Sequence, residues 1–63
     1  MNNDVDVYRI ARLLIEEHGV FAEDEVKDKI KRYTISGDYN AVKTWYEIEE
    51  ALNEINNVSA ESE

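Results

Sequence analysis

Residues 38–55 read DYNAVKTWYEIEEALNEI, and this stretch decides the fold. At about 100° per residue, its apolar positions gather on one side of a helix. These positions are Ala41, Trp45, Ile48, Leu52 and Ile55. The opposite side carries three carboxylates, Glu47, Glu50 and Glu54, which we name the acidic ridge. We therefore predict an amphipathic helix over residues 39–56 with a core face and an acidic ridge back to back.

Two glycines divide the rest of the chain into two further helical segments. Gly19 and Gly37 each follow a run with helical apolar spacing, and glycine commonly ends a helix because it adopts positive φ without strain. The sequence predicts helices over about 5–18 and 22–35, and no segment shows the alternation of a strand. The expected class is all-α, a compact three-helix domain.

Helix caps and the tail set the limits of this domain. Asp4 or Asp6 can cap the first helix, and Asp38 can cap the third. We predict a single domain over 1–56 and a disordered acidic C-terminal tail over 57–63.

The first two helices present apolar faces of different width. The first face is broad and consists of Val7, Tyr8, Ile10, Ala11, Leu14 and Ile15. The second is a narrow stripe of Ala22, Val26, Ile30 and Tyr33. Leu13 projects to the polar side of its helix, as a surface leucine or as a second contact. Phe21 and Ile35 flank the narrow stripe, and we expect them to pack at the two turns.

Composition narrows the possible functions. The chain has 63 residues, no cysteine and a net charge of −8, and residues 38–63 hold seven acidic residues and one lysine. Such a chain repels nucleic acid and anionic membranes and is attracted to basic surfaces. No apolar run approaches the ~20 residues of a bilayer span, and the N-terminus lacks the order of a signal peptide. We expect a soluble, cytoplasmic protein that binds neither nucleic acid nor membrane directly.

No residue pattern indicates catalysis, a cofactor or a metal. His18 is the only histidine and stands just before a glycine, where an imidazole favours the helix C-terminus. Adjacent carboxylates such as Glu16 and Glu17 point about 100° apart on a helix and do not converge on one atom. There is no glycine-rich phosphate loop and no calcium-loop order of acids. We predict that the protein is not an enzyme.

A second stripe lies beside Trp45 on the third helix and consists of Tyr39, Val42 and Tyr46. If the first two helices cover both stripes, these side chains complete the core. If they cover only the Trp45 stripe, the aromatic side chains form an exposed patch suited to an interface.

The order of motifs resembles a group of small bacterial proteins of about sixty residues with no established activity. The resemblance rests on an LLI-x-x-HG helix, a GD turn and a tryptophan helix. The matching residues are Tyr8, Ala11, Leu13, Leu14, Ile15, His18, Gly19, Gly37, Asp38, Trp45, Ile48 and Ala51. The middle helix is richer in lysine than this pattern. The resemblance implies the fold and no activity.

Two functional hypotheses follow from charge and patterning. The first is a non-enzymatic protein–protein interaction module, in its most specific form an inhibitor that occupies a basic nucleic-acid-binding surface, as anti-CRISPR and DNA-mimic proteins of phages do. Its predicted partner-binding residues are Glu47, Glu50, Glu54, Tyr39, Val42 and Tyr46. The second is a homo-oligomeric structural or antitoxin-like regulatory protein, which would bury the Tyr39-Val42-Tyr46 stripe or Leu13 between copies.

Overall fold

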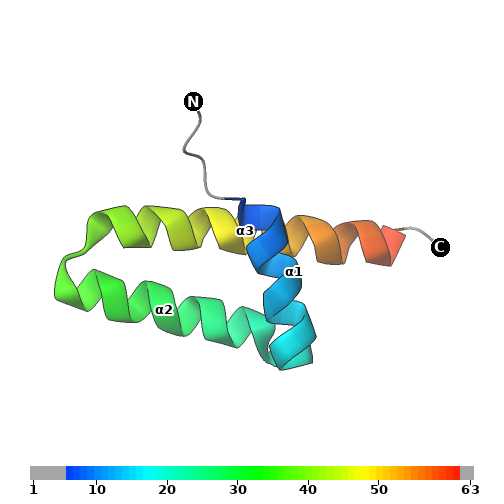
Figure 1. Cartoon of the computed structure of the whole chain (residues 1–63), viewed down its shortest axis with the longest axis horizontal. Helices are drawn as coiled ribbons and strands as arrows, with labels where there is room; N and C mark the ends of the chain where they lie inside the picture. Colours follow the sequence, from blue (N-terminus) through cyan, green and yellow to red (C-terminus); the bar gives the residue numbers. More distant parts are fainter. Residues whose placement is uncertain (1–5, 62–63) are drawn as a thin grey trace.

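Three α-helices and one short 3₁₀ turn make up the chain in the computed structural model, which describes residues 6–61 and side chains over 6–56 (Figure 1). The helices are α1 (Val7–His18), α2 (Ala22–Ser36) and α3 (Tyr39–Glu61), and the 3₁₀ turn η1 (Gly19–Phe21) joins α1 to α2. No strand occurs within residues 6–61, so the all-α class is confirmed.

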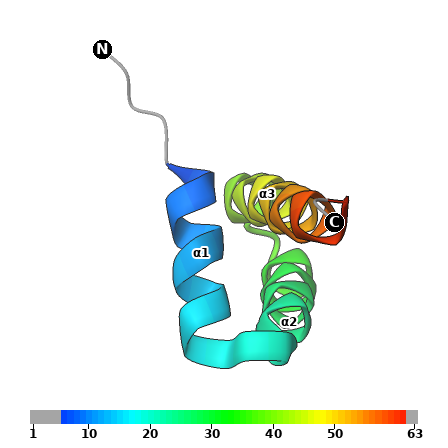
Figure 2. The same ribbon diagram turned by 90° about the vertical axis from the view of Figure 1, so that its right-hand side faces the viewer.

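The α2 and α3 helices run antiparallel as a hairpin, and α1 crosses this hairpin on one of its sides (Figures 1 and 2). The crossing lies at the start of α2 and near the middle of α3, and all three helices pack against one another. The half of the hairpin near its turn extends beyond α1. Two helices alone build that half, and this leaves much of its surface without a covering layer.

Two aspartates cap the helices from the N-terminal side. An Asp6 carboxylate oxygen accepts a hydrogen bond from the Arg9 backbone N–H at 3.1 Å, and Asp38 accepts one from the Ala41 N–H at 3.2 Å. Each bond satisfies one of the N–H groups that a first helical turn leaves free. Both predicted caps are confirmed, while Asp4 lies outside the described residues.

Both glycines adopt the positive φ that their positions predict. Gly37 has φ 81° and ψ 13°, and its N–H donates to the Thr34 carbonyl oxygen at 3.2 Å, while the Asp38 N–H reaches the Tyr33 oxygen at 3.0 Å. Gly19 has φ 59° with ψ −128°, a combination that residues with a Cβ rarely adopt. The two changes of chain direction therefore depend on glycine.

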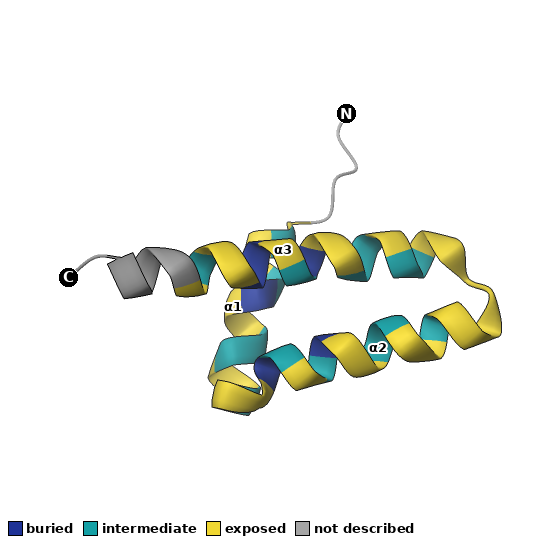
Figure 3. Cartoon of the chain, turned by 180° about the vertical axis from the view of Figure 1, so that it is seen from behind, coloured by how far each residue is buried: buried dark blue, intermediate teal, exposed yellow. Residues whose placement is uncertain are grey.

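The core lies where α1 crosses the hairpin, as the dark blue segments of Figure 3 show. Its fully buried side chains are Ala11, Ala22, Val26, Ile48, Ala51 and Leu52. The predicted apolar face of α3 supplies two of them, Ile48 and Leu52, and Trp45 and Ile55 pack against them half-buried. Ala51 was not among the residues of the predicted apolar face. Alanine at the crossing allows two helix backbones to approach closely.

Two turn residues and the end of the last helix differ from the prediction. Phe21 and Ile35 are 65% and 77% exposed, so the expectation that they pack at the turns is wrong. Ile35 lies at the hairpin turn, which α1 does not reach, and Phe21 ends η1 with its side chain largely in solvent (Figure 1). α3 continues to Glu61, so the disordered tail predicted from residue 57 is wrong for 57–61, where no glycine or proline stops the helix. Residues 62–63 lie outside the described range.

Leu52→Ala should remove most of the stability of this domain. Leu52 is 1% exposed, and truncating a buried leucine costs about 2–5 kcal/mol. A single core of this size rarely supplies more than about 3–5 kcal/mol. Leu13→Ala is the matched control, because Leu13 is 48% exposed and its loss should cost about 1 kcal/mol or less. Urea unfolding followed by circular dichroism measures both, and equal losses would contradict the core assigned above.

Candidate partner-binding surface

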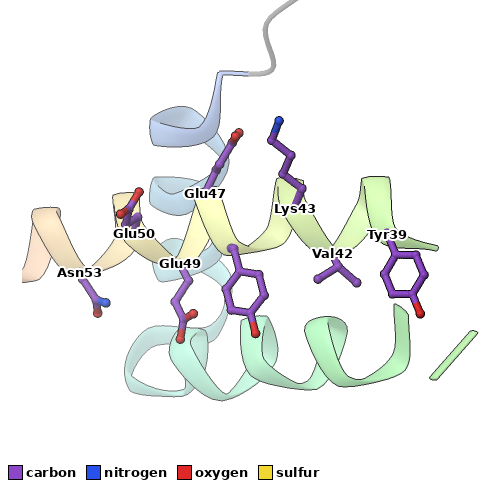
Figure 4. Close-up of a pocket in the computed structure, with 8 residues that line it drawn as sticks. Tyr39, Val42, Lys43, Glu47, Glu49, Glu50 and Asn53 are labelled. Carbon is purple, nitrogen blue, oxygen red and sulfur yellow. The ribbon is translucent and has the colours of Figure 1, made fainter. Parts of the chain in front are cut away.

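A shallow groove runs along α3 on the side that lies away from α1, which stands behind α3 in Figure 4. Every lining residue belongs to α3: Tyr39, Val42, Lys43, Tyr46, Glu47, Glu49, Glu50 and Asn53. Its volume of about 490 Å³ is within the range of small-molecule sites. Small-molecule sites bury most of their ligand, whereas a groove formed by a single helix would leave a bound small molecule exposed to water. The groove therefore suits the surface of a macromolecule.

Five of the six predicted partner-binding residues line this groove: Tyr39, Val42, Tyr46, Glu47 and Glu50. The structure also brings in Lys43, Glu49 and Asn53, which were not predicted. A signal for two of these was present in the sequence. Positions 39, 42, 46, 49 and 53 follow alternating steps of three and four, so Glu49 and Asn53 simply continue the aromatic stripe along one side of the helix.

The two tyrosines of the stripe lie at the surface. Tyr39 is 70% exposed and Tyr46 is 55% exposed, while Val42 is half-buried. The interpretation that these tyrosines complete the core is therefore wrong. α1 packs against one side of the hairpin, and within residues 6–61 no further helix covers the other side (Figure 2). Exposed aromatic side chains grouped in this way are typical of interfaces.

The cations of the described chain that form ion pairs all lie on α2. Lys27 pairs with Glu23 at 3.8 Å, Lys29 with Glu25 at 3.9 Å, and Arg32 with Asp28 at 3.0 Å. These exposed i,i+4 pairs each contribute only a few tenths of a kcal/mol. Six of the eight charged side chains of α2 are thus compensated within the helix itself.

Over residues 6–56, no α3 carboxylate forms an ion pair within 4.0 Å. Glu47 and Glu50 are exposed, whereas Glu49 is half-buried and projects to the opposite side of α3 from Glu47 (Figure 4). The only nearby cation that lines the same groove is Lys43, one turn before Glu47. The acidic half of the groove thus carries negative charge that no cation of residues 6–56 pairs with.

Glu54 has a different role from the other two members of the acidic ridge. The Tyr8 hydroxyl donates a hydrogen bond to Glu54 Oε1 at 2.6 Å and so ties the start of α1 to α3. This bond and the negative charge of Glu54 raise the pKa of Tyr8 above its ordinary value of 10.0, and the charge of Glu50 adds to the effect. Sequence reasoning missed the link because it assigned Tyr8 to an apolar face.

The histidine and carboxylate side chains of the described residues form no metal site. No group of three or more histidine or carboxylate side chains among these residues is arranged to hold a metal ion. His18 is half-buried at the last position of α1. Across residues 6–61, none of the helices has both the length and the apolar character that a bilayer span requires.

Comparisons with protein-family models, with curated proteins and with solved structures return no match. The function of this chain therefore has to be inferred from its own residues, and the resemblance to the small bacterial proteins stays a prediction.

The Tyr8–Glu54 link predicts an alkaline loss of stability that Tyr8→Phe removes. The pKa of Tyr8 is raised in the folded chain. The stabilisation that the hydroxyl contributes is therefore complete below pH 10.0, and it is lost as the pH rises through the pKa that Tyr8 has in the folded state. The free energy of unfolding should therefore fall more steeply above pH 10 in the wild type than in Tyr8→Phe. Tyr39→Phe is the control and should keep the wild-type slope. Parallel curves for the wild type and Tyr8→Phe would show that the link is absent in solution.

Proposed function

We propose that this chain is a non-enzymatic, cytoplasmic protein–protein interaction module that inhibits its partner by occupying a basic, nucleic-acid-binding surface. The observation that carries this proposal is the α3 groove, where carboxylates that form no ion pair with residues 6–56 line the same surface as two exposed tyrosines. Opposite charge on a partner would be drawn to this side of α3, and the tyrosines would supply buried contact area once it arrives.

The density of charge on α3 supports a nucleic-acid mimic that also needs apolar contacts. Glu47 and Glu54 are separated by about 10.5 Å along the helix axis, and four carboxylates lie within that span. Duplex DNA carries about six phosphate charges over the same length. The helix thus presents a weaker field than DNA, and competition with DNA for the same surface requires additional contacts. Tyr39 and Tyr46 are placed to provide them.

A partner other than a second copy fits this surface best. In a twofold dimer the same patch meets itself, so a dimer through the groove would set the Glu47, Glu49 and Glu50 side chains of two copies against each other. Each chain also carries a net charge of −8, which opposes the approach of another copy. The homo-oligomeric hypothesis therefore has to use other exposed side chains, such as Leu13 or Ile35.

A charge-reversal pull-down tests the proposed function. The tagged full chain is the bait, and the prey is the heparin-retained fraction of a bacterial lysate, which is rich in proteins with basic nucleic-acid-binding surfaces. Glu47→Lys/Glu50→Lys should lose the proteins that the wild type captures. Glu16→Lys/Glu17→Lys should retain them, because it makes the same change of charge at exposed positions of α1.

Captured proteins should also be released by rising salt and by added duplex DNA, since screening and competition both act on charge pairing. Capture that survives Glu47→Lys/Glu50→Lys, or that is indifferent to salt and DNA, would rule out the proposed function.

A further inference from the structure

We infer that the groove receives an amphipathic helix of the partner that is apolar at one end and carries arginines, in preference to lysines, at the other. This inference rests on the proposed function and specifies the segment of the partner that makes the contact. Three features of the groove carry it: its spacing, its change of character along α3, and the placement of Tyr46 among carboxylates.

The spacing of the groove matches the packing of two helices. Tyr39, Val42, Tyr46, Glu49 and Asn53 follow alternating steps of three and four, the repeat by which two helices lie along each other. The stripe is about 21 Å long, which corresponds to four helical turns on each side of the contact. The sticks of Figure 4 show Tyr39, Val42, Glu49 and Asn53 projecting toward the same side of α3, the side along which α2 runs, and Val42 and Glu49 are half-buried there. A helix laid in the groove, on the face of α3 away from α1, would contact the parts of these side chains that stay exposed.

The two halves of the groove differ in polarity and charge. The half near the hairpin turn holds Tyr39 and Val42 together with Lys43, and the other half holds Tyr46, Glu49 and Glu50. Lys43 stands four residues after Tyr39 and is its neighbour on the helix surface. Its positive charge therefore repels a cation of the partner at this end of the groove. The first half thus favours apolar side chains and the second half favours cations. This asymmetry also fixes the direction in which the partner helix lies.

Arginine suits the acidic half better than lysine. Glu49 and Glu50 stand three and four residues after Tyr46, and side chains at these steps are neighbours on a helix surface, about 5–6 Å apart at Cβ. A guanidinium is planar, so it can stack on the exposed Tyr46 ring while its N–H groups pair with a neighbouring carboxylate. A lysine ammonium is a compact and strongly hydrated charge, and it gains less from the ring.

A pair of designed peptides tests this preference. Both are fluorescein-labelled amphipathic helices of equal length and charge, with leucines at one end of the apolar face and three cations at the other, which are arginines in one peptide and lysines in its twin. Binding to the full chain is measured by fluorescence polarisation. The arginine peptide should bind about two- to fivefold more tightly. Tyr46→Leu should abolish that difference, because leucine keeps an apolar side chain and removes the ring.

Variants that remove carboxylate charges show which carboxylates contribute to peptide binding. Glu49→Gln/Glu50→Gln should weaken both peptides, whereas Glu16→Gln/Glu17→Gln on α1 should leave both affinities at the wild-type level. Circular dichroism of each variant confirms that the helices are retained. A peptide with the arginines and leucines scrambled along its length should bind more weakly than the ordered one.

Equal affinity for the arginine and lysine peptides, an unchanged preference in Tyr46→Leu, or equal binding of the scrambled peptide would overturn this inference. It fails separately from the proposed function: a partner whose capture still depends on Glu47 and Glu50 keeps the inhibitor hypothesis even where no arginine preference is found.

Discussion

The whole fold depends on one crossing, where Ile48 and Leu52 of α3 meet Ala11 of α1 and Val26 of α2. Within residues 6–56 the three helices bury six residues almost completely, and all of them lie at this crossing. Small side chains make the close approach possible, since Ala11, Ala22 and Ala51 account for half of the buried set. With so small a core, each large apolar side chain in it carries a large share of the stability.

The same crossing determines which surface stays free. α1 crosses one side of the hairpin near the start of α2 and extends neither to the hairpin turn nor around to the far side of α3 (Figures 1 and 2). Tyr39 and Tyr46 are exposed for that reason, not because their own positions on α3 are irregular. A fourth helix would be needed to cover them. The proposed partner helix would take that place, so that binding completes the layer that the chain itself lacks.

Local signals in the sequence were sufficient for the helices, and tertiary contacts account for the differences. Asp6, Asp38 and Gly37 act within four residues of themselves, so their roles could be predicted from neighbouring residues alone. Ile35 could not be placed in this way, because its exposure depends on where α1 crosses the hairpin. The Tyr8–Glu54 hydrogen bond joins residues 46 positions apart, and helical periodicity contains no information about such a pair. The groove is an intermediate case: the sequence showed the stripe of Tyr39, Val42 and Tyr46, but it did not show whether these side chains are exposed.

The Tyr8–Glu54 bond also joins the fold to the proposed function. It uses one oxygen of Glu54, and a carboxylate can accept further hydrogen bonds at its second oxygen. Glu54 can therefore hold α1 and still contribute negative charge to the acidic ridge. Near neutral pH Tyr8 is protonated, because its pKa is raised above 10.0, and its hydroxyl adds no charge that would attract or repel a basic partner. The hydrogen bond that stabilises the fold thus leaves the negative charge of the acidic ridge unchanged. The surface proposed to bind the partner can therefore be strongly acidic while α1 stays attached to α3.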